Sequence, residues 1–346
     1  MGKQIKMFGA EMQLARLSKM GDSLEKINEA IDWEMFRLPI RNQIRKADYS
    51  KGGRPPWDEI LMFKTTLLQD WNNLSDENTE YMINDRLTFQ RFLGMELGEK
   101  APDEKTIWLF KEQLGKDGMR ELFNLFNEKL VNLGLVKREG SLIDATFVDA
   151  PRQRNSREEN AKIKRGEIPE EWQTPENVNK LEQKDTDARW TKKGNELHYG
   201  YKNHTKVDNK SKIIVDFTVT PASTHDVDEF EGLIEINDRE AWLDAGYASE
   251  DHVARIKQKY PDIILHICER AYRNKSLTDE QKESNRVKSK VRARVEHVFG
   301  YMTRFMGGIT IRTIGIGRAE REICGMNLAY NIRRAVFLLT PKPGKT

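Results

Sequence analysis

Three acidic residues lie in surroundings where a carboxylate is costly unless it has a partner. Asp144 belongs to the apolar run Ser-Leu-Ile-Asp-Ala-Thr-Phe-Val, Asp244 belongs to Ala-Trp-Leu-Asp-Ala-Gly-Tyr, and Glu296 follows a string of basic residues. A buried carboxylate must be paired, hydrogen-bonded or bound to a metal. If the three converge, their oxygens would form a site for a hard divalent cation.

An all-oxygen site of this kind suits phosphodiester chemistry. Cutting a phosphodiester needs an activated water and a stabilised leaving alkoxide, and two metal ions about 3.5–4 Å apart supply both in an in-line displacement. Carboxylates alone can hold Mg²⁺, because this cation prefers hard oxygen ligands and tolerates retained waters. The chemistry requires no covalent nucleophile, so we expect none.

The segment that carries Glu296 is predicted to be a helix. Its basic residues alternate as in a strand, but its apolar residues recur every three or four positions: Val287, Val291, Val295, Val298 and Met302. This spacing is typical of an amphipathic helix. Arg292 would then lie one turn before Glu296 on the same side.

Basic residues are concentrated near the end of the chain. The whole chain has 58 Lys and Arg against 55 Asp and Glu, whereas residues 284–346 have 13 against three. Such a stripe is typical of a phosphate-backbone binder, and a solvated helix face is the alternative. Lys288, Lys290 and Arg294 would contact phosphates and set register without specifying sequence.

Composition excludes several classes of protein. No run in the 346 residues approaches the ~18 apolar residues of a membrane span, and the first residues lack the apolar stretch of a secretion signal. With only Cys268 and Cys324, neither a disulfide framework nor a Cys-rich zinc site is expected. We therefore expect a cytoplasmic protein with no membrane partner.

The chain changes character near residue 137. Residues 1–137 have apolar residues at helical spacing, with a turn or linker at 51–56, so they predict an all-helical unit. Helices are expected over 60–71, 81–93, from 102 onward and over 119–133. Residues 138–346 are expected to form a second domain.

The second domain is predicted to be a mixed sheet flanked by helices. Three segments rich in β-branched and aromatic residues predict strands, at 141–148, 197–207 and 213–220. Helix and strand then alternate, at 230–236, 241–244, 252–260 and 263–267. Residues 150–196 are charged and poor in apolar side chains, which predicts a long loop or a mobile insertion.

At this point the chain resembles the DDE transposases of bacterial insertion sequences, most closely the insertion-sequence-five group (InsH-like). Five motifs in family order carry the resemblance. They are Leu-Ile-Asp-Ala-Thr at 142–146, His-Tyr-Gly-Tyr-Lys-Asn-His at 198–204, Val-Thr-Pro-Ala-Ser-Thr-His-Asp at 219–226, Leu-Asp-Ala-Gly-Tyr at 243–247 and Arg-Ala-Arg-Val-Glu-His-Val-Phe-Gly at 292–300. The helical N-terminal part also resembles the N-terminal domain of that family.

The resemblance implies a ribonuclease H-like catalytic core behind a helical DNA-binding or dimerisation region. Asp144 would lie on the first strand, Asp244 just after the fourth and Glu296 on a later helix, all three as catalytic metal ligands. Arg292 is the basic residue four positions before the catalytic Glu. The family often has a Tyr and a Lys where this chain has Ser289 and Thr303.

The implied activity is metal-dependent cleavage and strand transfer of double-stranded DNA, at terminal inverted repeats and target sites. Two Mg²⁺ ions are expected, with Mn²⁺ able to substitute, in a homo-oligomer near the bacterial nucleoid. Two alternatives stay open. One is a stand-alone ribonuclease H-like nuclease, and the other is a non-catalytic DNA-binding protein derived from a transposase.

Several neighbouring residues have competing interpretations. Asp149 or Asp216 could be the first acid instead of Asp144, and Asp226 could cap the following helix. The six His residues match no zinc pattern. His225 and His297 could contact DNA or support the acids. Tyr199, Tyr201 and Lys202 could line the mouth of the site or belong to a structural strand.

Overall fold

The protein is described by a computed structural model that covers residues 9–44, 55–96, 98–271 and 276–340. It divides into two compact units, Met1–Phe126 with Cys324–Thr346, and Asn127–Ile323. The predicted division differs, because it assigns every residue after 137 to one domain. The two divisions differ because the second part of the last helix packs within the first unit. There the Nε1 of Trp71 donates a hydrogen bond of 2.8 Å to the carbonyl of Ala329.

Helices make up the first unit, as predicted. In chain order they are α1 (Gly9–Met20), α2 (Ser23–Ala30), η1 (Trp33–Phe36), α3 (Arg37–Gln43), α4 (Glu59–Asn72), α5 (Asp76–Asp85), α6 (Leu87–Leu93) and α7 (Glu104–Asn132), and α13 (Ile316–Leu339) closes the chain. None of the described helices is long and apolar enough to cross a membrane. The predicted turn at 51–56 lies mostly outside the described residues.

One of the predicted helices has different boundaries in the structure. The predicted helix at 81–93 is two helices, because Arg86 adopts an extended backbone that ends α5 and begins α6. The separate helices expected from 102 and over 119–133 are confirmed: α7 consists of two helical segments on either side of a kink at Gly115, whose φ is 62°. A glycine takes this left-handed conformation without the steric cost that a Cβ would add.

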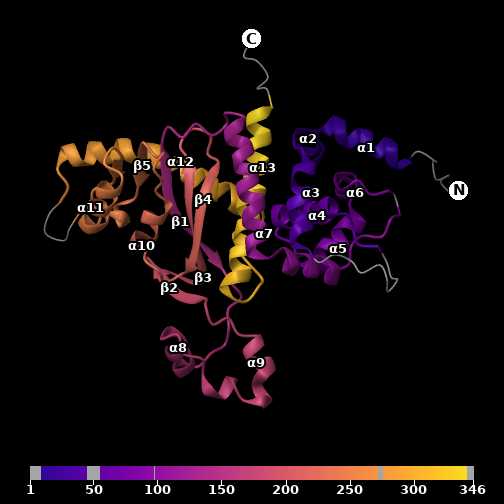
Figure 1. Ribbon diagram of the computed structural model, residues 1–346, viewed down its shortest axis with the longest axis horizontal. Helices are drawn as coiled ribbons and strands as arrows, with labels where there is room; N and C mark the ends of the chain where they lie inside the picture. The colour runs from indigo at the N-terminus through magenta and orange to yellow at the C-terminus, as the bar shows by residue number, and fades with distance from the viewer. Residues whose placement is uncertain (1–8, 45–54, 97, 272–275, 341–346) are drawn as a thin grey trace, which may run out of the picture. The chain divides into compact units, whose positions relative to one another are not determined.

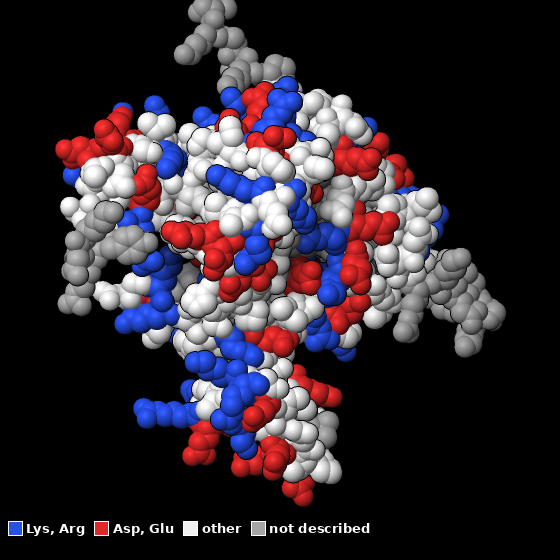
Figure 2. All heavy atoms as spheres, turned by 60° about the vertical axis from the view of Figure 1, so that its left-hand side comes forward, with Lys and Arg blue, Asp and Glu red and all other residues white. Residues whose placement is uncertain are grey.

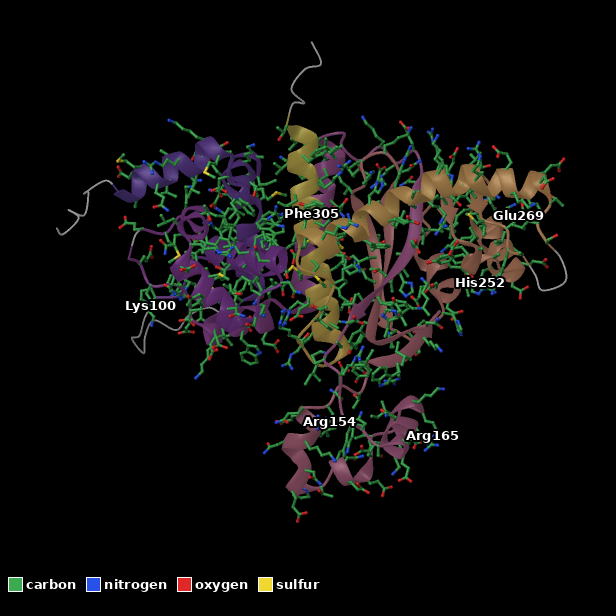
Figure 3. The ribbon with its side chains drawn as sticks, turned by 180° about the vertical axis from the view of Figure 1, so that it is seen from behind. Lys100, Arg154, Arg165, His252, Glu269 and Phe305 are labelled. Carbon is green, nitrogen blue, oxygen red and sulfur yellow. The ribbon has the colours of Figure 1, made fainter. Side chains whose placement is uncertain are left out.

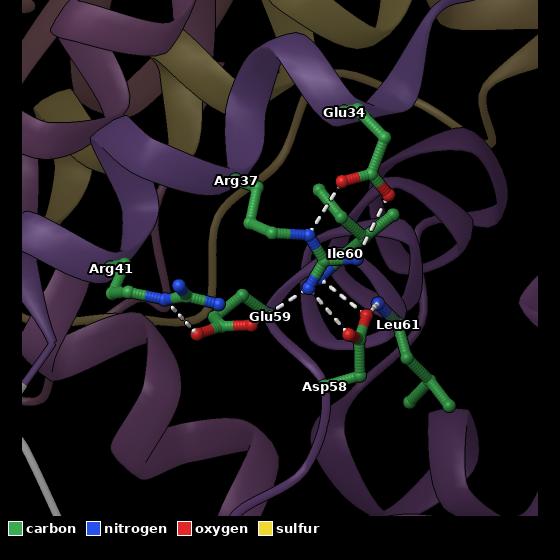
Figure 4. Close-up of polar contacts among 7 residues, drawn as sticks. All are labelled: Glu34, Arg37, Arg41, Asp58, Glu59, Ile60 and Leu61. Atoms are coloured by element: carbon green, nitrogen blue, oxygen red, sulfur yellow. Dashed lines mark hydrogen bonds and ion pairs between the residues drawn. The ribbon is translucent and has the colours of Figure 1, made fainter.

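An ion-pair network connects η1 and α3 to the start of α4 (Figure 4). The Arg37 guanidinium donates to Glu34 at 2.6 Å, to Asp58 at 2.5 Å and to Glu59 at 2.9 Å, and Arg41 donates to Glu59 at 2.8 Å. Asp58 is also the N-cap of α4, where its carboxylate accepts from two backbone N–H groups. The network therefore fixes one helix start from both sides.

A buried lysine lies in the core of the first unit. The Nζ of Lys64 is 4.9 Å from the ring centroid of Trp33 and 5.2 Å from that of Phe92. It donates to Asn28 Oδ1 at 2.6 Å and to the Phe92 carbonyl at 3.2 Å. Burial lowers the pKa of Lys64 to about 8, and the distant carboxylates of Asp58 and Glu34 compensate only in part.

The second unit is built on a six-stranded mixed sheet. Its strands are β1 (Ser141–Asp149), β2 (Arg189–Lys193), β3 (Glu196–Asp208), β4 (Ile214–Pro221), β5 (Glu240–Leu243) and β6 (Ile264–Ile267). Its longer helices are α10 (Asp226–Leu233), α11 (Glu250–Lys259) and α12 (Asp279–Phe305). The strands and helices predicted between 197 and 302 are therefore confirmed, with boundaries shifted by a few residues.

Strand order identifies the fold. β3 lies between β1 on one side and β4 on the other, antiparallel to both, and β2 pairs with the first half of β3. β5 and β6 then extend the sheet from β1 in parallel, each reached through a helix (Figure 1). Three antiparallel strands followed by two parallel ones form the ribonuclease H-like core that the resemblance implies.

The charged stretch at 150–196 is an insertion, but it is folded, not a loop. Residues 151–188, which we call the insertion lobe, contain α8 (Arg157–Lys164), η3 (Glu170–Trp172), η4 (Pro175–Asn177) and α9 (Val178–Glu182). Trp172 and Ile163 form a small buried core, and Ser156 and Glu159 form a capping box at α8. In Figure 1 the lobe projects beyond one end of the sheet.

Lys64 makes stability depend on pH. Its pKa is about 8 in the folded protein and near 10.5 when exposed, so the unfolded state binds more protons between these values and stability rises with pH in that window. We predict that the free energy of unfolding of the wild type, minus that of Lys64→Met, grows from pH 8 to pH 10.5. Urea unfolding followed by circular dichroism measures both, and a difference independent of pH would contradict the prediction.

Candidate active site

Asp144 and Asp244 occupy equivalent positions on neighbouring parallel strands. The register pairs Leu142 of β1 with Trp242 of β5, and each Asp lies two residues farther along its own chain. Asp144 is still within β1, whereas β5 ends at Leu243 and Asp244 begins the short turn η5 (Ala245–Tyr247). Because neighbouring strands lie about 4.8 Å apart, the topology alone brings these two carboxylates together.

One guanidinium contacts both acids. Arg292 on α12 places Nη1 3.0 Å from Asp244 Oδ1 and Nη2 3.4 Å from Asp144 Oδ2. This is possible because α12 packs against both β1 and β5, with Val295, Val298 and Met302 buried along its inner side. The predicted helix is confirmed, although Val287, at its exposed start, contributes nothing to the core.

The electrostatics of the site follow from burial. Burial raises the pKa of Asp144, and the nearby Asp244 carboxylate adds to this effect. The backbone N–H of Ala145, which donates at 2.9 Å, and the Arg292 guanidinium lower the same pKa in part. For Arg292, burial works against the charge, but the two carboxylates raise its pKa above the ordinary value. The ion pair therefore keeps Arg292 charged despite its partial burial.

Glu296 lies one turn beyond Arg292 on α12, as predicted, but its side chain is exposed. Within the described ranges it forms no hydrogen bond or ion pair, and no group of three or more His, Cys, Asp or Glu is arranged to hold a metal. The structure thus brings Asp144 and Asp244 together through Arg292. Convergence of all three acids stays a prediction.

Four of the five other residues predicted to bind DNA or support the acids have partners inside the protein. Lys288 donates to the Ile267 carbonyl at 2.8 Å, and Arg294 donates to the Asn209 carbonyl at 3.1 Å. Lys202 is buried and donates to Asp226 at 2.8 Å. The exposed Nδ1 of His297 lies 2.7 Å from the Nζ of Lys212. The fifth, Lys290 on α12, is exposed.

The competing acids lie elsewhere. Asp149 ends β1 on an exposed position, 3.6 Å from His198 Nδ1, and Asp216 lies within β4. Asp226 does not cap α10: His225 occupies the N-cap position, and the Asp226 carboxylate binds Lys202 instead. That carboxylate is also 3.9 Å from the buried His204, and burial lowers the pKa of His204 to about 4.

Tyr247 is a site residue that the sequence reasoning missed. It is buried, and its hydroxyl has no hydrogen-bond partner among the residues that the structure describes. Its ring lies in a core cluster with Ile143 and Leu243, the neighbours of the two acids. Burial and then the carboxylates of Asp144, Asp226 and Asp244 raise the pKa of its hydroxyl well above the ordinary value. Its place in the quoted motif Leu-Asp-Ala-Gly-Tyr was the available signal.

The two aspartates suit a hard divalent cation. Their oxygens face a single cationic group from two neighbouring parallel strands, and carboxylate oxygens are the ligands that Mg²⁺ prefers in proteins. Two carboxylates against one guanidinium also leave a net negative charge, which a cation would neutralise. In donor chemistry and in charge, the pair fits a metal.

Comparisons with known proteins show which family the chain belongs to. A family model described as "Transposase DDE domain" matches residues 136–332, more than half of the chain, and a second, "Transposase domain (DUF772)", matches residues 12–113. A solved structure, "Cryo-EM structure of piggyBac transposase synaptic complex with hairpin DNA", aligns with 94% of this chain and 74% of its own at 11% identity and a TM-score of 0.42. That TM-score is too low to support a functional comparison.

The fold and the paired aspartates define a ribonuclease H-like protein with two acids side by side on neighbouring parallel strands. The chain belongs to the DDE transposase family. Membership implies the cleavage and transfer of DNA phosphodiesters, and DDE transposases generally use divalent metal ions for this chemistry.

The Arg292 ion pair is tested by a double-mutant cycle. We predict that Arg292→Ala lowers the free energy of unfolding by about 1–3 kcal/mol, because the partly buried Asp144 loses its counter-charge. The half-exposed Asp244 should contribute little to this loss, since water screens it. In the Asp144→Asn background the loss should be smaller by about 0.5–3 kcal/mol, the interaction energy typical of residues in contact. Urea unfolding gives all four values.

Arg286→Ala is the matched control, since Arg286 forms only an exposed pair with Glu283 on the same helix. Its loss of stability should be clearly smaller than that of Arg292→Ala, because water screens an exposed pair. An Arg292→Ala variant no less stable than this control would contradict the prediction.

Proposed function

We propose that this protein is an active transposase of the insertion-sequence-five (InsH-like) group, which binds the terminal inverted repeats of its own element and moves it by cleavage and strand transfer. The observation that carries the proposal is the pair of aspartates at matching positions of the adjacent parallel strands β1 and β5, both in contact with one guanidinium. The five motifs quoted above support the group within the family.

In the proposed site, Asp144 and Asp244 hold Mg²⁺, and Glu296 completes the ligand set from α12. When bound, a pair of such ions activates the attacking oxygen and stabilises the leaving one. Asp144 positions its carboxylate from the rigid interior of β1, and Asp244 does so from the turn after β5. Glu296 is exposed, so its side chain is free to turn toward the pair by rotation about its own bonds.

Arg292 has two tasks in this proposal. Without metal it supplies the positive charge that keeps two like-charged carboxylates together. With metal and DNA present, the same guanidinium can contact a phosphate oxygen, because arginine presents several donors in a fixed fork that matches phosphate geometry. The residue then stays next to the acids but exchanges a carboxylate for a substrate oxygen.

Strand transfer requires two element ends in one assembly, so we propose that the protein acts as a dimer or larger homo-oligomer on double-stranded DNA. The helices of the first unit, part of which matches the second transposase family model, would bind the ends. We further propose that the protein works in the bacterial cytoplasm, at the nucleoid.

The three acids are tested by isosteric neutralisation. We predict that Asp144→Asn, Asp244→Asn and Glu296→Gln each reduce cleavage of end DNA by about 10³-fold or more, because each loses a metal ligand worth several kcal/mol in the transition state. Affinity for the same DNA should change little. Asp149→Asn, an exposed acid on the same strand, should cleave like the wild type. Normal cleavage by any one of the three would remove that residue from the site.

The joining of cleaved element ends to target DNA distinguishes a transposase from a stand-alone nuclease. We predict that pre-cleaved element ends with a free 3′-hydroxyl, incubated with the protein, Mg²⁺ and a plasmid target, give covalently joined products on a denaturing gel. Ends that carry a 3′-dideoxy terminus should give none, since the attacking group is missing. Cleavage of uncut ends without any joining of pre-cleaved ends would favour the nuclease.

A further inference from the structure

The insertion lobe has its charges separated in sequence and in space. Residues 152–165 contain six Lys and Arg against two acids, whereas residues 166–187 contain seven acids against two lysines. Figure 2 shows Lys and Arg gathered on the side of the lobe nearer the sheet, and Asp and Glu mostly toward its far end. A lobe that is almost neutral in total therefore presents a basic surface.

Four members of this basic surface are exposed and unpaired. Arg152, Arg154, Arg157 and Lys164 form no ion pair with an acid in the described part of the chain. Arg165, by contrast, is paired with Glu167 at 3.1 Å; Figure 3 labels Arg154 and Arg165 on the lobe. We call Arg152, Arg154, Arg157 and Lys164 the lobe basic surface.

Hydrogen bonds to the rest of the second unit hold the insertion lobe in place. Asp185 is buried and accepts hydrogen bonds from the Tyr201 hydroxyl of β3 at 2.8 Å and from the backbone N–H of Gly315 at 3.2 Å. Asp187 accepts from the backbone N–H of Ile316 at 2.9 Å. Arg189 of β2 reaches back to the Ile163 carbonyl of α8 at 3.0 Å. These bonds attach the lobe to the sheet that carries the acids.

Basic and aromatic side chains connect the lobe to the acidic pair. The Arg152 guanidinium lies 5.6 Å from the ring of the partly exposed Trp190 on β2. At the end of the same strand, the Nζ of Lys193 lies 5.7 Å from the ring of Phe147, three residues beyond Asp144 on β1. Positive charge thus extends from the neighbourhood of the acid to the lobe.

The spacing matches a stretch of duplex. Asp149, where β1 ends at the base of the lobe, lies five residues after Asp144. At about 3.3 Å per residue, the two positions are ~17 Å apart along the strand. Successive phosphates of one DNA strand advance by about 3.4 Å along the helix axis. A duplex along β1 would therefore reach the lobe about five nucleotides from the phosphate at the acids.

We propose that the lobe basic surface binds the backbone of the DNA duplex whose reacting phosphate lies at Asp144 and Asp244. The proposal rests on the proposed function for the identity of the DNA, and it assigns the insertion a phosphate-binding role without base recognition. The contacts are electrostatic, so their contribution to affinity depends steeply on salt.

The test compares two charge-matched variants in DNA binding without divalent cation, so that it does not depend on catalysis. Arg154→Ala/Arg157→Ala removes two charges from the lobe basic surface. Lys257→Ala/Lys259→Ala removes two exposed charges from α11, away from the lobe. Fluorescence anisotropy with element-end duplex, at several salt concentrations, gives the affinity and the slope of log K against log salt.

We predict that the lobe variant loses about 1.8 from the magnitude of the slope, since each lost phosphate contact contributes about 0.9. Its affinity at 0.1 M salt should fall roughly 10- to 100-fold by the same relation, while the α11 variant stays within about twofold of the wild type. Unchanged binding by the lobe variant, or an equal loss in both variants, would overturn the proposal.

Footprinting locates the contact. Hydroxyl-radical protection should disappear in the lobe variant from about five nucleotides beyond the cleavage position outward, while protection at the cleavage position persists. Loss of protection elsewhere, with the outer positions intact, would also overturn the proposal. If the lobe binds as proposed but cleavage and joining both fail, the proposed function is wrong and the binding surface still stands.

Discussion

The contact of one guanidinium with two carboxylates constrains the second unit more than any other interaction in it. Arg292 can reach Asp144 and Asp244 only if β1 and β5 are adjacent and parallel, and if α12 crosses both. Removing such charges from water costs several kcal/mol per ion, so packing elsewhere must hold them in place. Buried Ile143, Leu243 and Val295, each next in sequence to an acid of the proposed site, supply that packing.

The free site is left incompletely satisfied. Two carboxylates share one positive charge, and burial pushes Asp144 toward its protonated form. Within the part of the chain that the structure describes, the Tyr247 hydroxyl is also buried without a hydrogen-bond partner. Such groups cost stability unless something else supplies charge and hydrogen bonds. A divalent cation at the two acids would supply the missing positive charge.

Much of this arrangement could be predicted from local sequence, and the failures have a common cause. The strand that contains Asp144 and the strand before Asp244 could be predicted because each is a short apolar run. The helix carrying Arg292 could be predicted because its apolar residues recur every three or four positions. The insertion lobe was not, because its core is little more than Trp172 and Ile163. Its remaining support comes from hydrogen bonds between residues distant in sequence, such as Asp185 with Tyr201. Likewise, the sequence put Arg292 near Glu296, but only tertiary structure puts it between the two aspartates.

Counting charges along the sequence likewise fails to predict which basic residues are exposed and unpaired. Residues 284–346 have an excess of ten basic residues. However, Arg292, Lys288 and Arg294 bind acceptors inside the protein. The stretch 150–196 is nearly balanced, with 11 basic and 10 acidic residues, yet it displays a one-sided basic surface (Figure 2). A phosphate backbone responds to exposed, unpaired charge at the surface and not to the sum along a segment. Segregation of charge, more than its excess, is therefore what the proposed DNA-binding role of the lobe depends on.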